Sequence, residues 1–225
     1  MALTDKLADI ADAIREVGGT TAKLTPAEMP AAIGAAMETA DAVIAGTFSG
    51  AYVNDRITSL GKCFNENTTV TSVSCANVVT VRRNAFNACT SVTSIDLPSC
   101  TSIDYGGLGN CAKLTDVNLP ALKTVVQYTF SDDSALSKLR LPSLKNTHYG
   151  TFYKCTSLAA LILPGSFVTA QSAMDNTLYN TPIVNGTGYI YVPRDLVDTY
   201  KAATNWSAVA EQFRAIEDYP DVCGD

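Results

Sequence analysis

Side chains that could carry out acid–base, nucleophilic or metal chemistry are few in this sequence and form no recognisable pattern. The chain has a single histidine, His148, in the stretch KNTHYG, and its carboxylates are scattered rather than paired. Serine is frequent, but no serine lies in a G-x-S-x-G motif, which would raise a nucleophile on a strand-to-helix turn. Because catalysis needs titratable groups that converge on one point, we predict a protein that is not an enzyme and has no catalytic residues and no cofactor.

The seven cysteines also lack the spacing of a metal site. None belongs to a C-x-x-C pair, and their odd number does not suit a complete disulfide framework. Such frameworks are typical of short secreted domains, whereas this chain has 225 residues and shows no secretion signal. We interpret most of the cysteines as reduced, buried and serving as small apolar side chains in tight turns. A disulfide between neighbouring turns remains an alternative, and we predict no metal site.

Three of the cysteines share a column of a repeat with a period of 22 residues. Five blocks align without a gap over residues 67–176, and apolar residues recur at positions four, seven, nine and twenty. Position ten is proline in every block but the first, where Ala76 replaces it. Position seven holds Val73, Ile95, Val117, Leu139 and Leu161, and position twenty holds Phe86, Leu108, Phe130, Phe152 and Met174. Position one is cysteine in three of the five blocks, at Cys89, Cys111 and Cys155, and Asp133 is a departure from it.

One repeat can be translated into one turn of a solenoid. Positions seven and nine are two residues apart, so they face the same way in a strand, and the proline that follows ends that strand. A single unit cannot bury its own apolar side, but stacked units cover one another. We therefore predict an α+β repeat solenoid with parallel strands about 4.8 Å apart, in which equal positions form ladders.

The blocks resemble the BspA-type bacterial leucine-rich repeat, whose unit reads roughly C-x-x-L-x-x-I-x-L-P and ends in A-F-x-x. The matching stretches are CTSVTSIDLP, CAKLTDVNLP and CTSLAALILP, with RRNAFNAC for the return. The resemblance implies a leucine-rich-repeat array. In proteins of this type a stretch such as V-P-x-x-x-x-x-x-Y-K-x-A-x-x-W closes the array, and here it corresponds to Val192, Pro193, Tyr200, Lys201, Ala203 and Trp206.

The segments on either side of the repeats complete a four-part division of the chain. Residues 42–66 keep part of the pattern and are expected to form a capping hairpin or a degenerate repeat. Residues 67–176 hold the five repeats, and residues 177–225 are expected to form a C-terminal cap of a strand and a helix. Apolar spacing favours a helix through Tyr200, Val209 and Phe213, with Trp206 anchoring it on the last repeat and a ligand-stacking Trp206 as the alternative.

Residues 1–41 form the fourth part and are predicted to be a helical hairpin that attaches the chain to a partner. Apolar residues recur at helical spacing from Leu3 to Val17, Gly18–Gly19 ends that helix, and Thr25–Glu28 forms a capping box. The segment resembles a module at the start of phage and prophage tail or minor structural proteins, carried by I-A-x-A-I-R-E, a Gly-Gly-Thr turn and K-L-T-P-x-E-M-P-x-x-I. That resemblance implies attachment to other virion proteins through residues 1–41.

Composition limits the classes of partner. The net charge of −6 disfavours nucleic acid, since backbone binding needs clustered Lys and Arg. No run of 18 apolar residues is present, so membrane insertion is not expected. A homo-oligomer such as a trimer is an open alternative, because the apolar stripe of the N-terminal helix is narrow and suits self-association.

Two sets of side chains are candidates for a recognition surface. Position eight of each strand varies between uniform neighbours, and the return segment carries tyrosines, which give contact area at a low entropy cost. The candidates are Asp96, Asn118 and Arg140 on the strands, and Tyr105, Tyr128, His148, Tyr149 and Tyr153 on the return segment. The bland interpretations are that His148 is a surface loop histidine and that the tyrosines only half-bury over the convex side.

The function that these features favour is that of a phage or prophage virion-associated tail protein that recognises a host-surface glycan or protein. It would reside in the virion, or in the bacterial cytoplasm before lysis. The alternative is a bacterial cell-surface adhesin or host-interaction leucine-rich repeat protein located at the cell surface.

Overall fold

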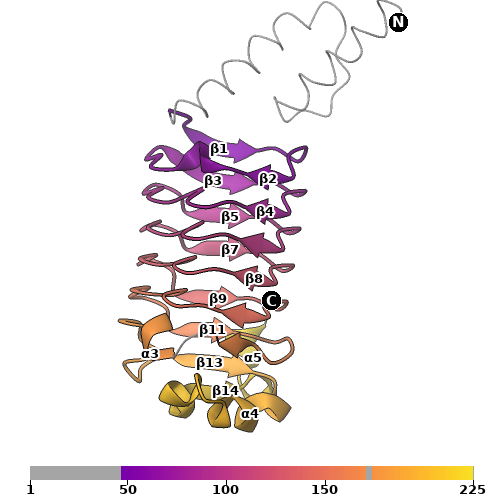
Figure 1. Cartoon of the computed structure of the whole chain (residues 1–225), viewed down its shortest axis with the longest axis vertical. Coiled ribbons are helices and arrows are strands. Elements are labelled where there is room, and N and C mark those ends of the chain that lie inside the picture. The colour runs from indigo at the N-terminus through magenta and orange to yellow at the C-terminus, as the bar shows by residue number, and fades with distance from the viewer. Residues whose placement is uncertain (1–46, 171–173, 225) are drawn as a thin grey trace, which may run out of the picture.

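The chain folds into a stack of short, parallel-stranded turns that is closed by a cap at the C-terminal end (Figure 1). The computed structural model describes residues 47–170 and 174–224. The predicted N-terminal helical hairpin and the side chain of Met174 therefore lie outside the described residues.

Each repeat contributes two strands to two separate ladders. One ladder contains β1 (Gly50–Val53), β3 (Val70–Ser74), β5 (Ser94–Asp96) and β7 (Asp116–Asn118), and it is followed by β9 (Lys138–Arg140), β11 (Ala160–Ile162), β13 (Tyr189–Val192) and β14 (Phe213–Ala215). The other contains β2 (Ser59–Leu60), β4 (Thr80–Val81), β6 (Ser102–Ile103) and β8 (Thr124–Val125), followed by β10 (Asn146–Thr147) and β12 (Thr169–Ala170).

The pairing register confirms the repeat period of 22. Val73 pairs with Ile95, and Ile95 pairs in turn with Val117, all in parallel. The same step joins Leu139 to Leu161 further along the stack. Equal positions of successive repeats thus lie above one another, as the sequence predicts.

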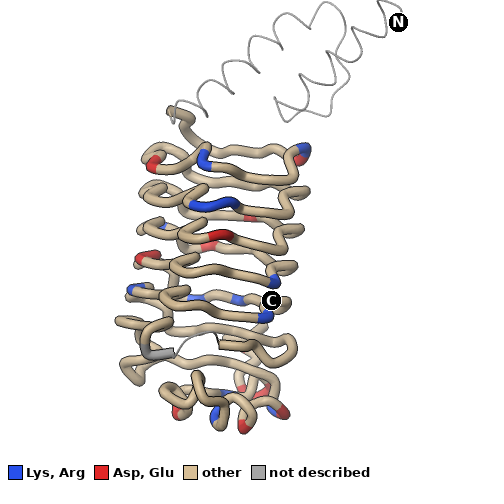
Figure 2. The backbone as a smooth tube through the Cα atoms, in the orientation of Figure 1, with Lys and Arg blue, Asp and Glu red and all other residues tan. Residues whose placement is uncertain are grey.

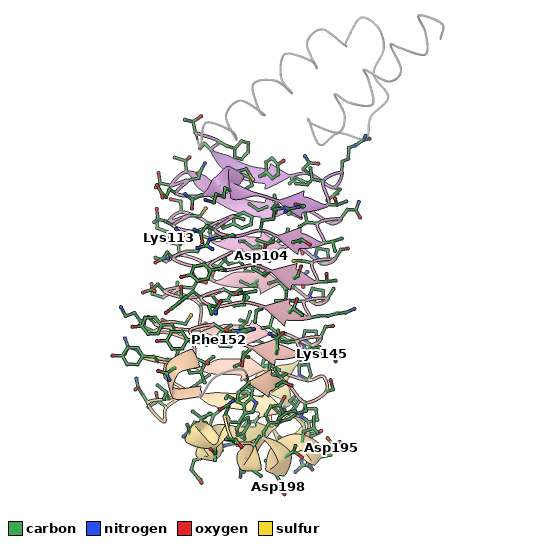
Figure 3. All side chains as sticks on the ribbon, viewed as in Figure 1. Asp104, Lys113, Lys145, Phe152, Asp195 and Asp198 are labelled. Atoms are coloured by element: carbon green, nitrogen blue, oxygen red, sulfur yellow. The ribbon has the colours of Figure 1, made fainter. Side chains whose placement is uncertain are left out.

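The interior of the stack is filled by the uniform columns. Position seven and position twenty are buried wherever their side chains are described, apart from the half-buried Val117. Phe64 stacks on Phe86 at 5.3 Å between ring centroids, and Phe130 stacks on Phe152 at 5.8 Å. Phe152 lies inside the turns, whereas Asp195 and Asp198 lie on the C-terminal cap (Figure 3). Each repeat therefore completes the core of its neighbour, which is the basis of solenoid stability.

Residues 47–66 extend the stack rather than fold back on it. Strand β1 pairs in parallel with β3, and β2 pairs in parallel with β4. A short 3-10 helix, η1 (Lys62–Phe64), carries Phe64 into the same aromatic column as the repeats. The described part of this segment thus forms one more turn of the solenoid.

The C-terminal cap is only partly helical, which corrects one expectation. It contains η2 (Arg194–Leu196), α4 (Val197–Ala202), η3 (Ser207–Gln212), η4 (Ile216–Asp218) and α5 (Pro220–Cys223), after α3 (Met174–Thr177) in the preceding turn. Phe213, predicted on the helix, instead begins strand β14, which pairs with β13. The helical path is interrupted at Val209, whose φ of −124° is not helical, and the edge of the sheet then gains a parallel partner.

Trp206 anchors this cap, as the sequence predicts. Its ring is almost fully buried, and its Nε1 donates a hydrogen bond of 2.9 Å to the carbonyl of Val168 in the last repeat. The hydroxyl of Tyr200 accepts a hydrogen bond of 2.8 Å from the N–H of Val168, and burial raises the pKa of Tyr200 to about 12. The alternative of a Trp206 that stacks on a ligand is wrong because the ring is not accessible.

Candidate recognition surface

Five tyrosines from four successive turns form one continuous aromatic row, which we call the tyrosine ladder. Its members are Tyr105, Tyr128, Tyr149, Tyr153 and Tyr179. Ring centroids are 5.6 Å apart from Tyr105 to Tyr128 and again from Tyr128 to Tyr149. The row continues over 6.2 Å from Tyr128 to Tyr153 and 5.1 Å from Tyr153 to Tyr179. The structure therefore brings together four predicted site residues that lie up to 48 positions apart.

The ladder remains open to solvent although its rings support one another. Tyr105, Tyr149 and Tyr179 are 36%, 41% and 51% exposed, and the other two rings are half-buried. Most large apolar side chains of the repeats are buried instead. An exposed aromatic row on a packed scaffold is typical of an interaction surface, since tyrosine offers contact area with few rotatable bonds.

Hydrogen bonds between turns fix the backbone beneath the rings. The N–H of Asn84 donates to the carbonyl of Tyr105 at 3.0 Å, and the N–H of Tyr128 donates to that of Tyr149 at 3.3 Å. Lys154 donates in the same way to Tyr179 at 2.7 Å. The stacking of the repeats consequently sets the backbone positions from which the rings project.

Tyr128 occupies a backbone position that disfavours a large side chain. Its φ is 59°, and the equivalent residues of the neighbouring turns are Asn84, Gly106 and Gly150, all with positive φ. A left-handed backbone costs an ordinary residue about 1–2 kcal/mol. The ring lies against Gly150, where an added Cβ would approach its Cε1 to 2.6 Å. The central ring of the ladder is therefore held in a strained backbone and over a glycine that makes room for it.

Basic groups lie beside the ladder. The guanidinium of Arg83 lies 4.6 Å from the ring centre of Tyr105, and the Nζ of Lys154 lies 5.2 Å from that of Tyr153. Desolvation, followed by the neighbouring phenol of Tyr149, raises the pKa of Tyr128. The central phenol thus stays neutral at physiological pH and can both donate and accept a hydrogen bond.

A shallow open groove of about 340 Å³ lies next to the first two rings. Its lining residues are Asn84, Asn87, Tyr105, Gly106, Asn110, Tyr128, Ser131 and Asp132. Two of its amides are linked, because the Nδ2 of Asn110 donates to the Oδ1 of Asn87 at 2.9 Å. Each amide has further donor and acceptor sites beyond this bond, so the groove combines two aromatic rings with a polar wall.

The three strand candidates lie on β5, β7 and β9, and each is hydrogen-bonded within the protein. Asp96 accepts hydrogen bonds from the Oγ of Ser74 at 3.1 Å and from the Nδ2 of Asn118 at 2.7 Å. Arg140 donates from one guanidinium nitrogen to the carbonyl of Cys223 at 3.0 Å. These three candidates are therefore engaged with the protein itself, whereas the tyrosines face outward.

The C-terminal tail covers the far end of the strand face. Ala160, Ile162, Tyr191 and Cys223 form a second small core, and Val222 packs against it. The side chain at position eight therefore varies for a structural reason as well, and its variation is not explained by ligand recognition alone. Ile162 is apolar because the tail buries it, whereas Asp96 and Asn118 at the same position stay outside that cover.

His148 lies next to the ladder in sequence, and its backbone forms hydrogen bonds within the turn. Its N–H donates to the Oγ1 of Thr151 at 2.9 Å, and its carbonyl accepts from the same hydroxyl at 2.8 Å. The side chain is half-buried. The arrangement positions a turn and offers no acid–base partner.

The cysteine column is structural in its geometry. The thiols of Cys89, Cys111 and Cys155 donate to the carbonyls of Phe64, Phe86 and Phe130 at 2.8, 3.2 and 2.8 Å. All seven cysteines carry free thiols, so the alternative of a disulfide between neighbouring turns is not realised. Across residues 47–170 and 174–224, no three His, Cys, Asp or Glu side chains gather as ligands for a metal ion.

Asp133 replaces cysteine in this column and is fully buried. Its Oδ1 accepts from the N–H of Cys111 at 2.8 Å, but its Oδ2 has no hydrogen-bond partner. Burial raises the pKa of Asp133 well above the usual value for a carboxyl group. The departure from the repeat therefore produces a buried acid rather than a functional group at the surface.

Sequence reasoning missed three components of the surface. Tyr179 was hidden because the last repeat is longer than 22 residues, so it falls out of the column. Arg83 shares a column with Tyr105 and Tyr149, and this shared position was the signal that could have identified it. The amides of Asn87 and Asn110 gave no signal, because polar turn residues are common on any solenoid.

Charged side chains of both signs are spread over the described part of the chain (Figure 2). In the view of Figure 2 both signs lie on the C-terminal cap, and no band of one sign runs along the turns. Among the helices of the described segments, none has both the length and the apolar content that a bilayer crossing requires.

Comparisons with known proteins address the scaffold. Residues 57–182 match the family described as "BspA type Leucine rich repeat region", in six copies. The crystal structure of a leucine-rich repeat protein of T. pallidum is similar at 19% identity and a TM-score of 0.45, covering 64% of each chain. One from Bacteroides ovatus is similar at 14% identity and a TM-score of 0.33, covering 66% of this chain and 56% of its own.

The comparisons cover only part of this chain and part of the proteins that it resembles. The chain spans less than two thirds of the length of either of those two proteins. A comparison with curated proteins gives no match. The family match begins at residue 57, so nothing supports the expected phage tail module in residues 1–41.

Proposed function

Because this chain belongs to the BspA-type leucine-rich repeat family, we propose that it is a recognition protein of the bacterial cell surface that binds a host-surface ligand through the tyrosine ladder. Leucine-rich repeats are typically binding scaffolds rather than enzymes. The observation that carries the proposal is the ladder itself. Five rings from four successive turns stay accessible on a rigid backbone, 5.1–6.2 Å apart along the row.

The tyrosine ladder is favoured over the strand face for two reasons. The strand candidates are satisfied by one another or by the C-terminal tail. The tyrosines, in contrast, expose apolar area whose removal from water would contribute to binding. A ligand on the strand face would first have to displace existing contacts.

A virion-associated tail protein is the second candidate. It is supported by the sequence resemblance of residues 1–41, which lie outside the described part of the chain, and by no comparison. In this role the same ladder would face bacterial cells, and residues 1–41 would contact other virion proteins.

Cell binding of the full chain separates the two candidates. Fluorescently labelled protein is added to cultured epithelial cells and, in parallel, to a panel of bacterial cells, and bound fluorescence is measured by flow cytometry. The proposal predicts binding to epithelial cells that falls at least tenfold for Tyr105→Ala combined with Tyr149→Ala. The matched control is Tyr219→Ala, because Tyr219 is 37% exposed but lies on the C-terminal cap.

Binding to bacterial cells alone, lost in the same double variant, would favour the virion-associated role. Binding that survives the double variant on both kinds of cell would contradict a role for the ladder.

A further inference from the structure

We propose that the ligand of the tyrosine ladder is a neutral oligosaccharide, seated in the groove beside Tyr105 and Tyr128 and held by the amides of Asn87 and Asn110 and the carboxylate of Asp132. This inference rests on the proposed function and names the class of ligand. It follows from the shape of the groove, from its polar wall, and from the sign of its charge.

The rings supply the apolar half of such a site. A sugar ring presents C–H groups on its flat faces, and these pack well on the electron-rich face of an aromatic ring. Tyr105 and Tyr128 meet edge-to-face at 63°, with centroids 5.6 Å apart. They therefore offer two differently oriented surfaces in the groove lining, which suits two linked sugar units better than one flat ligand.

Other lining residues supply the polar half of the site. Sugar hydroxyls both donate and accept, so they need amide and carboxylate partners at their edges. Asn87 and Asn110 both line the groove and are joined by a hydrogen bond of 2.9 Å, which restricts the orientation of the two amides. Asp132 also lines the groove, and its carboxylate can accept hydrogen bonds from hydroxyl groups, which are short and strong.

Charge favours a neutral ligand over an acidic one. Asp132 is the only charged residue among the groove-lining set. Its carboxylate repels sugars that carry sulfate or carboxylate groups. Arg83 is directed to the ring of Tyr105 at 4.6 Å and is not part of the lining.

A protein partner is less well matched to this groove. Protein interfaces depend on anchors that fill well-packed, desolvated pockets, whereas this groove is shallow and lined largely by polar side chains. A peptide strand would need a free sheet edge, but β6, the strand that precedes Tyr105, is paired on both sides, with β4 and with β8.

The groove is also formed before any ligand arrives. Five of its lining residues have a left-handed backbone: Asn84, Gly106, Asn110, Tyr128 and Asp132. The N–H of Asn110 donates to the carbonyl of Ser131 at 2.7 Å, which joins one turn to the next. A preorganised site loses little conformational entropy on binding, and this compensates for the modest energy of each sugar contact.

The test is a set of immobilised oligosaccharides, neutral and acidic, probed with the full chain. Neutral members are expected to retain the protein. For a retained oligosaccharide, calorimetry should show Kd rising about tenfold in Tyr105→Ala, through loss of one stacking surface, and also rising in Asn110→Ala. The controls are Tyr219→Ala on the cap and Asn185→Ala in an exposed turn, which should leave Kd unchanged.

The outcomes separate this inference from the proposed function. Retention of the protein by acidic oligosaccharides only would overturn the neutral ligand. Retention by no oligosaccharide, while cell binding still depends on Tyr105, would also overturn it and would leave the ladder as a protein-binding surface. Retention that Tyr105→Ala does not change, together with cell binding that the ladder variants do not change, overturns both.

Discussion

At the scale of residues, the ladder depends on a steric match between Tyr128 and Gly150. Gly150 has a φ of 66°, and a Cβ there would lie 2.6 Å from the ring of Tyr128. Gly186 has a φ of 81° but open space around it. Alanine substitutions at the two glycines therefore distinguish the cost of a left-handed backbone, which both positions share, from the cost of contact with Tyr128, which only Gly150 has.

Gly150→Ala should lower the free energy of unfolding by about 2 kcal/mol or more, through a left-handed alanine and a crowded ring. Gly186→Ala should show the backbone cost alone. Urea denaturation of both variants measures the difference. Equal losses would mean that the ring of Tyr128 does not rest on Gly150. Adding Tyr128→Ala to Gly150→Ala should recover the contact cost, since the two sites are directly coupled.

Asp133 gives a second residue-level prediction, because its carboxyl group replaces a thiol in a buried column. The variant Asp133→Cys should donate to the carbonyl of Leu108, as the other column thiols donate 25 residues back. The change removes an unsatisfied buried oxygen, and we expect a gain of about 1–3 kcal/mol at neutral pH.

The pH dependence of that gain has a definite sign. Burial, opposed by the N–H of Cys111 and reinforced by the nearby Asp132, raises the pKa of Asp133 in the folded state. Folding therefore favours the protonated acid, and stability is lost as pH rises through the folded-state pKa. The advantage of Asp133→Cys should grow from pH 5 to pH 8 in urea denaturation, with the exposed Asp116→Asn as control. An advantage that shrinks over that range would contradict a raised pKa.

At the scale of elements, the C-terminal tail protects the end of the strand face. Helix α5 places Cys223 and Val222 over Ile162 and Tyr191, and Arg140 holds the tail through the carbonyl of Cys223. An apolar residue at position eight is thus explained by an element almost 60 residues away in sequence.

Removal of residues 220–225 should expose this second core. We expect a loss of about 2 kcal/mol in the free energy of unfolding, close to the burial of one large apolar side chain, and an increase in binding of a hydrophobic dye. Ile162→Arg in the shortened chain should reduce that dye binding, because it restores a polar residue of the kind found at Arg140. Unchanged stability and dye binding after truncation would show that the tail does not cover the face.

The elements also show where sequence reasoning succeeds and where it stops. A strict period of 22 with proline after each strand predicts parallel ladders, and the register confirms it. The strand β14 was expected to be helical, because apolar spacing near Phe213 fits a helix as well as a strand, and only the open edge of β13 decides between them. The role of Ile162 was inaccessible for the same reason, since it depends on a tertiary contact.

The candidate surface was predictable in part. Tyr105, Tyr128, Tyr149 and Tyr153 stood out by residue type, and the repeat placed them on one side. Their contact as a row and the groove beside them depend on the directions of the rings, which the aligned repeat sequence does not determine. At the strand positions the same reasoning could not tell Asp96 and Arg140, which bond within the protein, from residues free to bind a ligand.

At the scale of the whole molecule, two faces compete for the recognition role. The solenoid presents the strand face with Asp96 and Asn118, and the face of the return turns with the tyrosine ladder. Stacked repeats hold both faces rigid. We propose that binding depends on the ladder, because its rings are exposed and mutually supported, while the strand side chains are already paired.

The most direct measurement compares the two faces in one assay. The full chain, the ladder variant Tyr105→Ala with Tyr149→Ala, and the strand variant Asp96→Ala with Asn118→Ala are titrated onto the cells that the unaltered protein binds. We predict at least a tenfold loss of affinity for the ladder variant and less than a twofold change for the strand variant, with both variants folded by circular dichroism. A loss confined to the strand variant would contradict this prediction.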